Sequence, residues 1–140
     1  MENLFPYLQP KAVGKKKLPP YRDVKWDFTA DCPVFQNGEP VFVEGLEAVR
    51  TWAYCALRTE RFLYRIYSRG YGNEIYNLIG KPFILATKAA EAKRYLAECL
   101  TVSPYISGVD NISVEFADGR FSVDCTIRTI YGEGGVTINV

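Results

Sequence analysis

Two long stretches of the chain carry apolar residues at helical spacing and predict amphipathic helices. The first opens at Gly45 and runs through about residue 57, and the second covers residues 83–100, where Pro104 prevents it from continuing. The apolar face of the first consists of Leu46, Val49, Ala53, Ala56 and Leu57. The clearest stripe of the second consists of Leu85, Ala89, Ala92, Leu96 and Leu100. A shorter apolar pattern over residues 74–79 predicts one or two helical turns.

Alternating or β-rich patterns predict strands in the N-terminal half of the chain. Residues 24–28 form a short alternating segment, and residues 33–43 contain Asn37-Gly38, the dipeptide that most strongly indicates a tight hairpin. Residues 61–67 are rich in Phe, Ile and Tyr and alternate in part, so we expect a strand there.

The last third of the chain reads as antiparallel strands. Residues 109–116 and 121–129 alternate on either side of the turn Asp118-Gly119. Three glycines within residues 132–135 predict a flexible turn, and residues 136–140 alternate as a last short strand.

This order of elements predicts an α+β fold, because strands and helices fall in separate runs. We expect a small antiparallel sheet with the helices packed on one face. The chain divides into an extended arm rich in proline and lysine (residues 1–23), a single α+β domain (residues 24–131) and a C-terminal strand extension (residues 132–140).

Positive charge is concentrated in the arm, where Lys15, Lys16 and Lys17 follow one another. The whole chain has a net charge of only +1, which is too small to indicate a dedicated nucleic-acid binder. The arm is therefore either an interaction tail or simply a solvated terminus.

Composition also restricts the chemistry. The chain has no His, so Ser-His and Cys-His pairs are impossible and a zinc site has few ligands. We interpret the four cysteines as reduced, mostly buried thiols; they are Cys32, Cys55, Cys99 and Cys125. We find neither a phosphate-binding loop, nor an apolar run long enough for a membrane span, nor a secretory signal pattern, and we predict no cofactor.

Paired carboxylates are the best remaining catalytic arrangement. Glu60 and Glu74 flank the aromatic segment, and a glycosidase needs two carboxyl groups at a defined separation. Glu60 is followed by Arg61, however, so capping or pairing with an arginine explains it better than general acid catalysis. We therefore expect a protein that is not an enzyme.

Arginine and aromatic residues alternate between residues 58 and 71. The arginines are Arg58, Arg61, Arg65 and Arg69, and the aromatic residues are Phe62, Tyr64, Tyr67 and Tyr71. Both residue types are enriched in protein interfaces. An exposed strand with its aromatic face inward would give the same pattern, and stacking on a single-stranded nucleic acid is a third reading.

In this same region the chain resembles the baseplate wedge and sheath-initiator family of contractile tails, which has T4-like and PBSX-type branches. Residues 57–64 and 71–82 carry the resemblance, which extends over residues 36–131. Thr59-Glu60-Arg61 is similar to the PBSX-type branch and departs from the Glu-Pro-Arg form of T4-like relatives.

The resemblance implies a structural role in the baseplate of a phage tail or tail-like particle. Such a protein, present in multiple copies around the tail axis, links wedge, tube and sheath and starts sheath assembly. Its partners would be other wedge proteins, the sheath protein and tube or hub proteins, and it would be made in the host cytoplasm. A non-catalytic adaptor module is the alternative, ahead of a glycan-cleaving, lysozyme-like enzyme.

Three groups of residues are candidates for partner binding. The first, for contacts with wedge proteins, is Arg58, Glu60, Arg61, Arg65 and Tyr71. The second, for an acidic partner surface, is Lys15, Lys16 and Lys17. The third, for a sheet shared with the first sheath ring, is Val136, Ile138 and Val140, because so short a strand cannot be stable alone.

Overall fold

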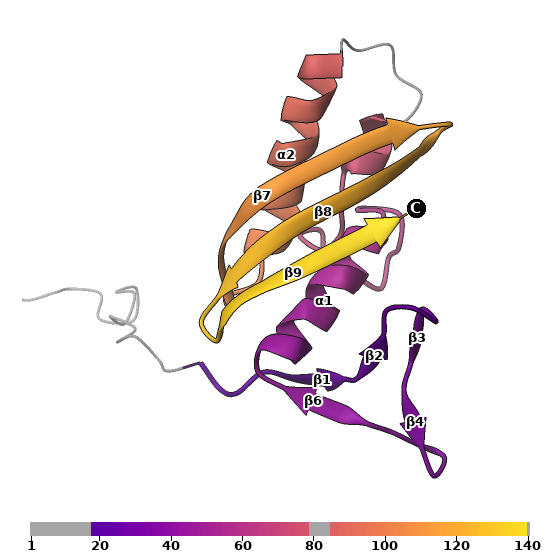
Figure 1. The fold of residues 1–140 in the computed structure, drawn as a ribbon, viewed down its shortest axis with the longest axis vertical. Coiled ribbons are helices and arrows are strands. Elements are labelled where there is room, and N and C mark those ends of the chain that lie inside the picture. Colours follow the sequence, from indigo (N-terminus) through magenta and orange to yellow (C-terminus); the bar gives the residue numbers. More distant parts are fainter. Residues whose placement is uncertain (1–17, 79–84, 140) are drawn as a thin grey trace, which may run out of the picture.

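The computed structural model describes residues 18–78 and 85–139, in which two α-helices pack on one face of a three-stranded antiparallel sheet (Figure 1). The helices are α1 (Leu46–Arg58) and α2 (Leu85–Thr101), and a 3₁₀ turn, η1 (Ile75–Leu78), lies between them in sequence. The sheet has the order β7 (Ile106–Ala117), β8 (Arg120–Thr129), β9 (Gly132–Asn139). This arrangement confirms the predicted α+β class.

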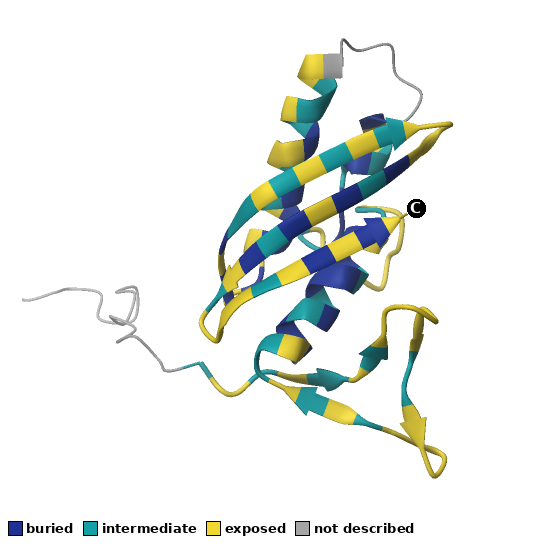
Figure 2. Cartoon of the chain, viewed as in Figure 1, coloured by how far each residue is buried: buried dark blue, intermediate teal, exposed yellow. Residues whose placement is uncertain are grey.

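The core lies between the sheet and the helices. β8 is the central strand, and its alternate residues are buried as the sequence pattern predicts: Phe121, Val123, Cys125 and Ile127. Figure 2 shows the same alternation along β9, where Val136 and Ile138 are buried. The helices contribute Val49, Ala53, Ala56, Leu57, Ala92, Leu96 and Leu100. Burial of these apolar side chains is the main driving force for the fold.

Both predicted two-residue turns are present, and both require a left-handed backbone. Asn37 and Gly38 have φ values of 53° and 80°, and Asp118 and Gly119 have 51° and 73°. Two consecutive positive φ values are typical of the type I′ turn, which matches the twist of the strands on either side. The two hairpins are therefore fixed by local sequence.

Residues 22–44 form a separate triangular lobe beside the sheet (Figure 1). Its strands form three short antiparallel pairs. Two are hairpins, β2 (Trp26–Asp27) with β3 (Cys32–Pro33) and β4 (Phe35–Gln36) with β5 (Glu39–Pro40), and the third joins the first strand of the lobe to the last, β1 (Arg22–Val24) with β6 (Phe42–Glu44). Lys25, Val34 and Val41 join them through a ring of main-chain hydrogen bonds of 2.7, 2.9 and 3.0 Å. The lobe satisfies its backbone without a large apolar core.

Aromatic and ionic contacts attach the triangular lobe to α1. The ring of Phe28 meets Tyr54 edge-on at 5.0 Å, and the Tyr54 hydroxyl donates to Asp31 at 3.0 Å. Asp31 also forms an ion pair with Arg58 at the end of α1. Hydrogen bonding from Arg58 holds the pKa of Asp31 below its usual value. Since both side chains are partly exposed, solvent weakens this pair.

The predicted strand over residues 61–67 is wrong. The chain makes a series of turns there, with Phe62 at a φ of 71° and Tyr67 N–H bonded to the Tyr64 carbonyl at 3.4 Å. We call residues 61–71 the aromatic loop. No strand of the described chain lies alongside to pair with it. A β-rich composition without a pairing partner does not make a strand.

The C-terminal strand is longer than predicted. Gly134 and Gly135 lie within β9 rather than in a flexible turn, and the reversal comes earlier, at Ile130 and Tyr131. The division into arm, domain and extension stays a prediction, although β9 shares a sheet with β7 and β8.

Several sequence predictions fall outside the described residues. They concern Lys15, Lys16, Lys17, the start of the long helix at Phe83, and Val140.

Candidate interaction surfaces

β9 forms one edge of the sheet and pairs with β8 along all of its 8 residues. Antiparallel pairs alternate between residues bonded across the ladder and residues whose main-chain groups point away. The Gly135 carbonyl accepts from Arg50 Nε on α1 at 2.9 Å, so it points away from β8. By the same alternation, Thr137 and Asn139 also direct their main-chain groups to the free edge.

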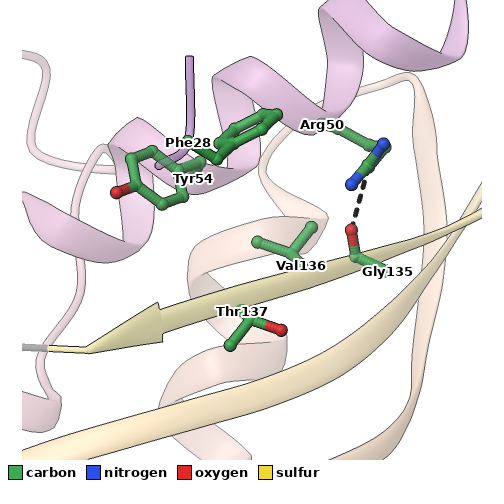
Figure 3. A pocket seen from close by; sticks show the side chains of 6 residues that line it. All are labelled: Phe28, Arg50, Tyr54, Gly135, Val136 and Thr137. Carbon is green, nitrogen blue, oxygen red and sulfur yellow. Dashed lines mark hydrogen bonds between the residues drawn. The ribbon is translucent and has the colours of Figure 1, made fainter. Parts of the chain in front are cut away.

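A cavity of about 250 Å³ opens beside this edge. The rings of Phe28 and Tyr54 form one side of it, and Val136 and Thr137 form the other, with Arg50 reaching across to β9 (Figure 3). The lobe, α1 and the sheet edge therefore meet at one apolar hollow. A strand that paired with β9 would run along its opening and could place a side chain inside.

The aromatic loop forms a second surface. Five of its large apolar side chains are at least 44% exposed: Phe62, Leu63, Tyr64, Ile66 and Tyr67. Ile66, at 86%, is the most exposed of them. Exposed apolar side chains gathered in one short segment are typical of interaction surfaces, which makes the aromatic loop a candidate.

Asn73 closes the aromatic loop from within the core. Its side chain is fully buried, donates to the Leu57 carbonyl at 3.3 Å and accepts from the Ile75 N–H at 3.0 Å. Its main-chain N–H donates to the Thr59 carbonyl at 2.8 Å, and its carbonyl accepts from Arg61 at 3.2 Å. One polar residue thereby joins the end of α1, both ends of the loop and η1.

Gly72 supports the same closure because no other residue fits there. It has a φ of 108°, and a Cβ would lie 2.8 Å from the Arg61 Cα. The backbone segments at Gly72 and Arg61 therefore lie so close together at the base of the loop that no side chain fits between them.

Arg58 and Arg61 are engaged inside the molecule. Besides Asp31, Arg58 contacts the Tyr54 hydroxyl at 3.3 Å. Arg61 Nε donates to the Arg69 carbonyl at 2.7 Å, and its Nη1 lies 3.7 Å from Glu74. These arginines shape the base of the loop, and their role in partner binding stays a prediction.

Glu60 and Glu74, the two carboxylates considered for catalysis, have different contacts. Glu74 forms an ion pair with Arg61, with 3.7 Å between Glu74 Oε1 and Arg61 Nη1. Glu60 instead forms a parallel bridge with Asn73 through the main chain.

Arg65 and Tyr71 differ in exposure. Arg65 is exposed within the aromatic loop. Tyr71 is half-buried, with its ring 4.7 Å from Tyr67 and 6.0 Å from Trp52. Burial raises the pKa of Tyr71 to about 12, so its hydroxyl stays protonated. Tyr71 thus anchors the loop, whereas Arg65 is free to meet solvent or a partner.

Val136 and Ile138 point into the core and are 4% and 1% exposed. Contact with a neighbour at this strand would therefore use the main chain of β9 and not these side chains.

Sequence reasoning missed Arg50, Phe28 and Asn73. Arg50 is an ordinary polar position on a helix, and its contact with Gly135 spans 85 residues of sequence. Asn73 follows Gly70 and Gly72, a pattern typical of a break between elements, and nothing local distinguishes a buried asparagine from an exposed one.

The prediction of mostly buried cysteines holds for Cys99 and Cys125, whereas Cys55 is partly buried and Cys32 is exposed. All four cysteines are free. Burial raises the pKa of Cys99 to about 12 and that of Cys125 to about 11, so these two thiols are poor nucleophiles. The described part of the chain has no group of three potential metal ligands. Among its helices we find none with the length and apolar character needed to cross a membrane.

Comparison with known proteins identifies the family. A family model described as contractile injection system sheath initiator matches residues 22–132, from β1 to the start of β9. The chain is also 35% identical over 101 residues to the phage-like element PBSX protein XkdS of Bacillus subtilis strain 168, which covers 70% of this chain and 72% of that protein. The lobe, both helices, β7 and β8 lie within the matched region, whereas β9 lies beyond it except for its first residue. The chain belongs to the contractile injection system sheath initiator family.

Proposed function

We propose that this chain is a structural protein on which the sheath of a contractile tail begins to assemble, with the free edge of β9 as the place where the first sheath ring adds a strand. The observation that carries the proposal is the orientation of Thr137 and Asn139, whose main-chain groups face away from β8. The family description, a sheath initiator, supports a structural role in a tail.

Strand addition suits this edge for two reasons. Main-chain hydrogen bonds supply affinity without requiring a particular sequence, and a side-chain pocket supplies selectivity. The cavity beside Val136 and Thr137 provides that pocket.

The aromatic loop is our proposed contact with the baseplate. It combines exposed apolar side chains with Arg65, which is the composition of protein interfaces. We assign it to neighbouring wedge, tube or hub proteins, in a baseplate with several copies of this chain around the tail axis. The two surfaces would then place the chain between baseplate and sheath.

The arm is a third proposed contact. Lys15, Lys16 and Lys17 would lie along an acidic partner surface and become ordered on assembly. We expect the arm to be cut by protease in the purified protein and protected in assembled particles, and equal cleavage in both would contradict the proposal.

Thr137→Pro tests the strand-addition site. Proline removes an N–H that points to the free edge and spares the ladder with β8. Thr137→Val is the matched control, because both changes remove the hydrogen bond from the Thr137 hydroxyl to Asp124. Particles carrying Thr137→Pro should have complete baseplates without polymerised sheath in electron micrographs. Normal sheath in those particles would overturn the proposal.

A further inference from the structure

We propose that Arg50 caps the β9 edge by occupying the Gly135 carbonyl, and that it gives up this contact to an incoming sheath strand that carries an acidic residue. This inference rests on the proposed strand addition. The acidic side chain would lie near Gly135, on the face of the incoming strand that points toward α1. Arg50 is thus a specificity-determining residue for the partner.

Arg50 is held across the edge by three contacts. Its Nε donates to the Gly135 carbonyl at 2.9 Å, and its guanidinium carbon lies 5.5 Å from the centre of the Phe28 ring. Its aliphatic stem passes over Gly134, where an added Cβ would lie 2.9 Å from the Arg50 Cδ. The absence of a side chain at position 134 is therefore what allows the arginine to reach the edge.

Within the described residues, Arg50 uses only its Nε–H as a hydrogen-bond donor. A guanidinium has five N–H donors in a planar fork, and Nε uses one of them on Gly135. In the part of the chain that the structure describes, no carboxylate forms an ion pair with Arg50. The terminal nitrogens can thus receive a carboxylate in two-point geometry, the strongest arrangement for this side chain.

The cap has a physical consequence for partner choice. An exposed strand edge pairs indiscriminately unless something blocks it. A strand that docks on β9 must take over the Gly135 carbonyl, which leaves the guanidinium without that acceptor in a partly apolar groove. An acidic residue on the incoming strand compensates for this loss, whereas a neutral strand does not, so the cap discriminates between them.

The experiment immobilises the full-length chain and measures, by interferometry, its binding of the sheath protein from the same particle. Arg50→Glu should weaken binding about tenfold or more, because like charges then face each other across the interface. Arg50→Met, which keeps an aliphatic stem over Gly134, should weaken it less and remove part of its dependence on salt. Lys93→Glu makes the same charge change on the exposed face of α2 and should leave binding unchanged.

Charge exchange completes the test. Acidic residues in the terminal segments of the sheath protein are changed to lysine one at a time, and one of these changes should restore binding to the Arg50→Glu chain. If Arg50→Glu and Arg50→Met bind within twofold of the unchanged chain while Thr137→Pro does not bind, the assignment of Arg50 is overturned and strand addition stands. If Thr137→Pro binds normally, the docking site itself is wrong.

Discussion

β9 and the aromatic loop both reach the surface, but β9 exposes main-chain groups and the aromatic loop exposes side chains. β9 buries Val136 and Ile138 and leaves main-chain groups at its edge. The aromatic loop ties down its main chain through Asn73 and leaves its side chains in solvent.

In our proposal, this difference lets one small protein serve two kinds of partner. A main-chain edge accepts another strand, with selectivity from whatever lies beside it. A side-chain surface needs a partner of matching shape. Mutations that alter the backbone and mutations that alter side chains should therefore separate the two surfaces. Three predictions from mutation and one from pH follow, in order of their expected effect on stability.

Asn73→Ala should have the largest effect. It leaves the Leu57 carbonyl and the Ile75 N–H without their partner in the core, which should lower the free energy of unfolding by about 3 kcal/mol. Urea denaturation followed by circular dichroism measures this. Asn77→Ala, at an exposed position of η1, should change stability by less than about 0.5 kcal/mol. Equal stability of the two variants would mean that Asn73 does not hold the loop.

Gly134→Ala and Gly135→Ala should act in opposite directions, although the residues are neighbours. A Cβ at 134 collides with the stem of Arg50, whereas one at 135 meets nothing within 4 Å. We expect the first to destabilise by about 1 kcal/mol and the second to stabilise by about 0.5 kcal/mol through a less flexible unfolded chain.

Thermal unfolding of both variants, repeated with Arg50→Ala, tests this pair. The cost at position 134 should shrink once Arg50 is gone, because the colliding stem is removed. An unchanged cost would show that Arg50 is not what the new Cβ meets.

Acid should loosen the triangular lobe, which lines the cavity beside β9, before it loosens the aromatic loop. Because Arg58 lowers the pKa of Asp31, the pair stabilises the fold above the unfolded-state value near about 4, and that stabilisation is lost as pH falls through the lower folded value. The effect is small, since the pair is partly exposed. Amide shifts of residues 22–44 should change as pH falls below the usual carboxyl range, ahead of those of residues 61–71. In Asp31→Asn this early change should be missing.

Ile66→Ser should have the smallest effect on stability, within about 0.5 kcal/mol, because the side chain is already in solvent. Incorporation into baseplates should nevertheless fall, since an apolar contact is lost. Comparing melting temperature with the amount of this protein in purified baseplates measures both. Val49→Ser, a change at a buried position of α1, is the contrasting variant, because it should lower the melting temperature. Full incorporation of Ile66→Ser would remove the aromatic loop from the proposed interface.

The sequence by itself determined the elements whose pattern is local. The burial of Phe121 and Ile127 follows from alternation on β8, and the turns at Asn37-Gly38 and Asp118-Gly119 follow from residues that tolerate positive φ. Both long helices are placed by their apolar stripes. The family resemblance likewise depends on short motifs in a fixed order, and it is confirmed.

Only the tertiary structure decided what each surface offers. Residues 61–67 have the composition of a strand, but no neighbouring strand is available to pair with them, and Asn73 closes them into a loop. Arg50 and Gly135 lie 85 residues apart, and only the packing of α1 against β9 brings them within 2.9 Å. Local patterns record which residues prefer burial or a turn, whereas contacts between distant segments exist only once the core has formed, and both candidate surfaces are made of such contacts.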